Sequence, residues 1–114
     1  MAKEENSTSD LVKKETMFIV AFVCIIAGFL LGIMYRRSGQ PQKAIEAFDR
    51  AIATDPKHEN SRFNKGIVLM HDLNDREGAI AAWEELVEVN PNALTPNGSQ
   101  PLKVMIDRVK GSMN

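Results

Sequence analysis

The chain is poor in the residues that most often build metal and disulfide sites. Its 114 residues include one cysteine and two histidines. Cys24 alone cannot form an intramolecular disulfide or a cysteine-based zinc site. Neither His58 nor His71 has a second ligand at the spacing of a zinc site. The sequence therefore predicts neither a bound metal nor a cofactor.

An excess of charge of either sign is also missing. The chain carries 14 Lys and Arg against 15 Asp and Glu, for a formal net charge of -1. A nucleic-acid-binding domain needs a basic surface that neutralises phosphates, and the charges here are mixed rather than gathered. We expect no nucleic-acid partner.

The short motifs of common enzyme sites are absent as well. The sequence contains no G-x-x-x-x-G-K-[ST], G-x-G-x-x-G or G-x-S-x-G. The adjacent carboxylates Glu84 and Glu85 point in different directions on a helix. His58 is expected in a solvated turn after a helix that ends at Asp-Pro-Lys, and His71 near a helix C-terminus. We expect that the protein is not an enzyme.

Charged residues are wholly absent from residues 17–35, MFIVAFVCIIAGFLLGIMY. As a helix this run would be ~28 Å long, close to the ~30 Å hydrocarbon core of a bilayer. Cations flank it on both sides: Lys13, Lys14, Arg36 and Arg37. A cleaved signal peptide is the competing interpretation. However, the sequence at the end of the run, IMYRRSGQ, contains no small-x-small cleavage site. The sequence favours an uncleaved transmembrane helix at 17–35, after a flexible polar tail at 1–16.

Two glycines inside the run, Gly28 and Gly32, have the G-x-x-x-G spacing. This spacing can let two transmembrane helices approach each other closely. A homo-oligomer through these glycines is therefore a possible arrangement.

After the apolar run the sequence repeats itself. AIEAFDRAIATDP at 44–56 superposes on AIAAWEELVEVNP, which begins 35 positions further along, at residue 79. LGIMY at 31–35 superposes on KGIVL at 65–69 with an offset of 34, so the second copy has one residue inserted in its turn, HDLNDRE. A period of this length is typical of a helix–turn–helix repeat.

The repeat resembles the tetratricopeptide repeat, a family of helix pairs that stack into a superhelix and bind peptides or proteins. The matching positions are Leu31, Gly32, Tyr35, Gly39, Ala44, Phe48, Ala51 and Pro56 in the first copy, and Gly66, Leu69, Ala79, Trp83 and Pro91 in the second. Small residues at Gly32 and Gly66 let paired helices approach, and Phe48 and Trp83 fill the space between neighbours. Arg62, Lys65 and Leu86 depart from the family pattern.

The resemblance also implies a binding surface on the inner face of the first helix of the second copy. In this family that face often contacts an extended peptide, and an asparagine there can hold the peptide backbone. The residues of this face are Asn60, Phe63, Asn64, Ile67, Met70 and His71. They are the predicted partner-binding residues.

The sequence thus predicts an all-α fold, with an N-terminal transmembrane helix, a short array of helical hairpins and a C-terminal capping helix. The expected segments are the tail at 1–16, the membrane helix at 17–35 with 31–38 shared with the first repeat, the rest of that repeat at 36–58, the second repeat at 59–92, a linker at 93–100 and the cap at 101–110. Leu102, Met105, Ile106 and Val109 would share the buried face of the cap.

The membrane helix and the first repeat compete for the same residues. The second helix of that repeat, at about 41–54, would run back toward the membrane with several charges, each costing ~2.5–3.5 kcal/mol near the bilayer centre. Three arrangements stay open: the hairpin pairs only through the last turn or two near 31–35, the apolar run leaves the bilayer partway, or an anchor has partly replaced the first helix of a shortened array. We expect one continuous helix through the stretch at 28–39, with the helix at 41–54 folded back against its exit end.

The predicted function is that of a single-pass membrane-anchored module that binds a protein or peptide partner. The chain resembles small bacterial membrane-anchored repeat proteins that assist envelope assembly, including maturation of c-type cytochromes. This resemblance implies the bacterial inner membrane, with the repeats on the periplasmic side, whereas the flanking charges are nearly balanced. The alternative is a structural protein that forms homo-oligomers and has no separate ligand.

Overall fold

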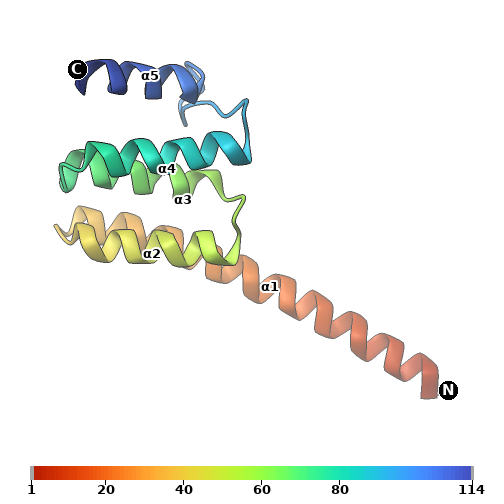
Figure 1. The fold of residues 1–114 in the computed structure, drawn as a ribbon. Coiled ribbons are helices and arrows are strands. Elements are labelled where there is room, and N and C mark those ends of the chain that lie inside the picture. Colours follow the sequence, from red (N-terminus) through yellow and green to blue (C-terminus); the bar gives the residue numbers. More distant parts are fainter. Residues whose placement is uncertain (1, 114) are drawn as a thin grey trace.

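The computed structural model describes residues 2–113 and contains helices joined by short connections (Figure 1). The elements are α1 Ala2–Arg37, α2 Pro41–Thr54, α3 Glu59–Ile67, the π-helical turn η1 Val68–Asp72, α4 Arg76–Val89 and α5 Leu102–Met113. Within residues 2–113 there is no β-strand, only an isolated bridge between Leu94 and Pro101. The predicted all-α fold with a terminal capping helix is confirmed.

Helix α1 is longer than the sequence predicted. It begins at Ala2, so residues 2–16 are helical where a flexible tail was expected; Met1 lies outside the described residues. Residues 2–27 contain neither glycine nor proline, so nothing in the sequence interrupts the helix upstream of the apolar run. This N-terminal part projects from the rest of the molecule (Figure 1). With α1 included, the molecule is 70 Å long in its largest dimension.

Helices α1 and α2 form an antiparallel hairpin around Gly39. The Gln40 N–H donates to the Tyr35 carbonyl at 2.8 Å and the Gly39 N–H to the Arg36 carbonyl at 3.1 Å. Gly39 has φ 78°, a conformation that favours glycine and closes the helix end. Pro41 then starts α2, where its missing N–H costs nothing.

The contact between α1 and α2 extends far beyond the exit of α1. A Cβ built on Gly28 would lie 3.2 Å from the Ala51 Cβ, and Cys24 and Thr54 line one groove between the two helices. The arrangement in which the hairpin pairs only near 31–35 is therefore not the one in the structure. Helix α2 packs against residues 24–35 of α1.

The inserted residue of the second repeat is absorbed by η1. Here the Leu73 N–H donates to the Val68 carbonyl at 3.1 Å, one residue wider than the α-helical pattern. Asn74 then adopts φ 54°, and Asp75 caps α4 by accepting from the Gly78 N–H at 2.9 Å. A second hairpin forms despite the extra residue.

The core consists of two clusters. The first is built around Phe48 and Val68, with Phe29 and Ile33 of α1 packed against it. The second is built around Trp83 and includes three residues of α5: Leu102, Ile106 and Val109. Helix α5 covers the open face of α4, and Lys110 pairs with Glu84 at 2.6 Å. The hydrogen bond from Lys110 to Glu84 raises the pKa of this lysine.

Replacing either inter-helix glycine should destabilise the fold. A Cβ on Gly32 would lie 2.4 Å from the Phe48 ring, and one on Gly66 2.1 Å from Trp83 Nε1. We expect Gly32→Ala and Gly66→Ala each to lower the free energy of unfolding by about 1–3 kcal/mol through overpacking. Urea unfolding of the full chain in mild detergent, followed by fluorescence of the single tryptophan, measures this.

Gly111→Ala is the matched control, because a Cβ there meets nothing within 4 Å. Alanine should leave stability unchanged or raise it by up to about 1 kcal/mol through helix propensity. Equal effects at all three glycines would contradict the packing role of Gly32 and Gly66.

Candidate functional site

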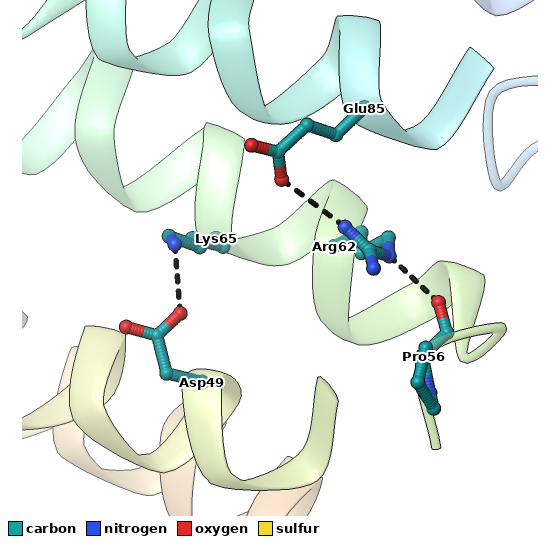
Figure 2. A network of polar contacts seen from close by, with 5 residues as sticks. All are labelled: Asp49, Pro56, Arg62, Lys65 and Glu85. Carbon is teal, nitrogen blue, oxygen red and sulfur yellow. Dashed lines mark hydrogen bonds and ion pairs between the residues drawn. The ribbon is translucent and has the colours of Figure 1, made fainter. Parts of the chain in front are cut away.

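Helix α3, which carries four of the six predicted binding residues, is held on both sides by polar contacts (Figure 2). Arg62 donates to the Pro56 carbonyl at 2.9 Å and to Glu85 of α4 at 3.1 Å, and its side chain is only 13% exposed. Lys65 pairs with Asp49 of α2 at 2.7 Å. The two departures from the family pattern in α3 are therefore cations that join it to its neighbours, in place of apolar packing.

His58 fixes the start of α3. Its ring accepts a hydrogen bond from the Ser61 N–H at 3.3 Å, and the Ser61 hydroxyl oxygen lies 2.6 Å from Nδ1. The ring meets Phe29 of α1 edge-on, with 5.6 Å between centroids. The expected solvated turn residue is thus a half-buried helix cap that also links α3 to α1.

A pocket lies beside the first turns of α3, where the end of α4 and the following linker approach it. Its volume is about 290 Å³. The lining residues are Glu59, Asn60, Phe63, Leu86, Asn90, Asn92, Leu94 and Pro96. The lining combines apolar and amide side chains, and Glu59 is the single charged residue in it.

The walls of the pocket are fixed by contacts behind them. Phe63 stacks on Trp83 with 6.0 Å between ring centroids, and Trp83 Nε1 donates to the Phe63 carbonyl at 3.1 Å. The Asn90 amide donates to Glu59 at 3.0 Å, which ties the end of α4 to the start of α3. A pocket with such walls is largely formed before any ligand arrives.

The structure divides the six predicted residues among different environments. Asn60 and Phe63 line the pocket, and Asn64 lies one turn further, where its amide donates to the Asn60 carbonyl at 2.7 Å. Ile67 and Met70 are half-buried against the second core cluster, and His71 is exposed in η1. Only the first turns of α3 therefore contribute to the pocket.

The linker supplies lining residues that the sequence did not suggest. Residues 93–100 were expected only to connect α4 with the cap. Instead the Thr95 N–H donates to the Gln100 carbonyl at 3.0 Å and the Leu102 N–H to the Ala93 carbonyl at 2.9 Å. These bonds close the linker into a loop that presents Leu94 and Pro96 to α3. Its turn-rich composition signalled a bend, but not the direction of the bend.

The described residues offer little for other kinds of site. In this part of the chain, no three His, Cys, Asp or Glu side chains are placed to hold a metal ion. The apolar and amide side chains that line the pocket suit recognition by shape and amide hydrogen bonds. An extended peptide segment presents both the apolar side chains and the backbone groups that such a pocket can take.

The other surface of interest is the apolar part of α1. Ser9–Arg37 is long and apolar enough to cross a membrane by length and composition, a test that a buried core helix or a signal sequence also passes. Of its most apolar window, 11% is buried in the structure. A membrane span is therefore weakly indicated.

Within the chain, the G-x-x-x-G pair packs against α2. Gly28 faces Ala47 and Ala51, and Gly32 faces the Phe48 ring, all on α2 of the same chain. Both glycines are buried in the hairpin. While the hairpin is intact they cannot pack against a second copy.

The stacked hairpins and the capping helix define a helical-repeat protein. Residues 29–58 match the family model of the tetratricopeptide repeat. The match covers the end of α1, all of α2 and the turn that leads to α3. This segment is thus similar to the tetratricopeptide repeat, a family whose members generally bind proteins or peptides. No curated protein matches the chain.

The two cations of α3 should differ in their effect on stability. Arg62→Ala removes a nearly buried guanidinium with two acceptors, and we expect it to lower the free energy of unfolding by about 1–2 kcal/mol. Lys65→Ala removes a more exposed pair and should cost at most about 0.5–1 kcal/mol. Urea titration of both variants at low and high salt tests this order. A larger loss from Lys65→Ala would refute it.

Proposed function

We propose that the protein is a membrane-anchored interaction module, which holds a protein partner through the pocket at the start of α3. The observation that supports this most directly is the pocket itself: preformed, apolar on several sides and rimmed by amides, on a fold whose relatives bind peptides. Helix α1 would supply the anchor, and anchoring raises the local concentration of the bound partner near the membrane.

The composition of the pocket favours a particular kind of peptide. Leu86, Leu94 and Phe63 offer apolar surface, while Asn60 and Asn92 offer both donors and acceptors. A single carboxylate, Glu59, disfavours acidic side chains at that edge. We propose a partner segment with an apolar anchor residue and few acidic neighbours.

The resemblance to small bacterial membrane-anchored repeat proteins suggests a more specific role for the module. We propose that the module assists assembly of envelope proteins, c-type cytochromes among them, from the inner membrane with its repeats on the periplasmic side. In this proposal the binding face continues beyond the pocket through Asn64 and Ile67 of α3 to Met70 and His71 of η1.

The pocket proposal is tested by affinity capture from solubilised membranes. Leu94→Asp places a carboxylate in the pocket at a side chain that is 55% exposed, so it leaves the core intact. We expect this variant, and Asn60→Ala, to retain about tenfold less of the proteins captured by wild type, as the loss of a central contact would.

Val104→Asp is the matched control, because Val104 is 45% exposed on α5 and does not line the pocket. It should capture the same proteins as wild type in the same yield. If Leu94→Asp also behaves like wild type, the pocket is not the binding site.

A further inference from the structure

Helix α2 occupies the part of α1 that a bilayer would need. The two helices run antiparallel, so the start of α2 lies near the exit of α1, where the Lys43 ammonium is 5.9 Å from the centroid of the Tyr35 ring. At the other end Cys24, Ala27 and Thr54 line a shared groove of about 500 Å³. Residues 24–35 of α1 are thus covered on one side by α2.

The apolar run has no spare length. A span of a ~30 Å core needs about 20 residues, and residues 17–35 supply about that number. The span cannot move upstream, since Lys13, Lys14 and Glu15 precede it. The part that α2 leaves free, residues 17–23, is only ~10 Å long as a helix.

The exposed face of α2 is too polar to accompany α1 into lipid. Lys43, Glu46, Asp49 and Arg50 are all exposed on the described surface. Arg50 lines the groove beside Cys24 and Ala27, which fall near the middle of the 17–35 run. Its guanidinium would stand at the bilayer centre, where a charge is most costly.

A shift of α2 relative to α1 would also disturb contacts with the second hairpin. Asp49 is paired with Lys65, and Phe29 of α1 contacts the ring of His58 before α3. A bilayer that surrounded residues 24–35 would therefore also separate α1 from the start of the second hairpin.

Around residues 17–23, however, α1 is apolar on every side. Met17, Phe18, Ile19 and Phe22 are each more than 60% exposed. A helix that is apolar around its whole circumference fits the bilayer interior rather than the membrane surface, where one face must stay polar. The free part of α1 thus favours a crossing orientation, which draws residues 24–35 into lipid as well.

We infer that the bilayer and α2 are alternative partners of residues 24–35 of α1. This inference rests on the proposed membrane anchoring. When α1 crosses a bilayer, α2 leaves this stretch and its buried face, which includes Ala44, Phe48 and Ala51, becomes accessible. When α2 is docked, as in the structure, α1 cannot span.

The single native cysteine makes the two states measurable. Thr54→Cys adds a second thiol across the groove from Cys24, so a short bismaleimide can join them when α2 is docked. In the full chain reconstituted into phosphatidylcholine vesicles, we expect no such crosslink in the fraction that resists alkaline extraction. Cys24 in that fraction should also resist a water-soluble maleimide.

The control pair is Glu84→Cys with Lys110→Cys in a Cys24→Ser background. These side chains are in contact between α4 and α5, away from α1. They should crosslink equally well with and without vesicles. If the extraction-resistant fraction crosslinks Cys24 to position 54 as completely as this control, α2 stays docked and the inference is overturned while anchoring stands. Release of the whole chain by alkaline extraction overturns the anchoring, and the inference with it.

Locking the hairpin tests the same competition from the other side. Protein crosslinked between Cys24 and position 54 before it meets vesicles should insert about a hundredfold less than the uncrosslinked variant, the penalty expected for even one charge near the bilayer centre. Protein crosslinked between positions 84 and 110 should insert like wild type. Equal insertion of both crosslinked forms would contradict the inference.

Discussion

The close approach of paired helices at a glycine is the constraint on which the structure depends. At Gly32 the Phe48 ring occupies the space that a Cβ would need, and at Gly66 the Trp83 ring does the same. Each large aromatic side chain is thereby buried completely or nearly so, and each hairpin acquires a core in spite of its small size. Because stacking one hairpin on the next buries a continuous surface, the position of these two rings also sets the position of α3, and with it the pocket.

This constraint explains why α1 has two uses that conflict. Glycine in an apolar helix suits close packing against any partner that comes near, whether another helix in lipid or α2 in water. In the structure both glycines pack against α2, whose opposite face is charged and exposed. The residues that make the first repeat possible are therefore the same ones that an anchor would need to place in the bilayer.

Much of the fold could be predicted from the sequence because it depends on the spacing of residues that are close together in the chain. The offset between the two copies located the hairpins, and the bounds of α2 and the identity of the cap follow from Pro41 and from the apolar stripe of α5. The site was harder to predict. The six predicted residues lie on α3 and η1, and the sequence pattern did not show that Ile67 and Met70 pack inward. It also did not show that the linker folds back and brings Leu94 to the pocket that Phe63 lines. Such contacts depend on tertiary packing, which a single sequence does not display.

The extra residue of the second repeat shows how packing overrules local pattern. An insertion at the end of a helix could have displaced Trp83 from Gly66, since it changes the register between the paired helices. Instead η1 widens one turn, and the displacement is confined to the loop at Asn74. There Asp72 accepts a hydrogen bond from Arg36 Nε at 2.8 Å, which joins the second hairpin to the exit of α1. A change in the pairing of α1 would therefore reach α3 through this contact as well as through His58. The position of α3, which lines the pocket, therefore depends on how α1 is packed.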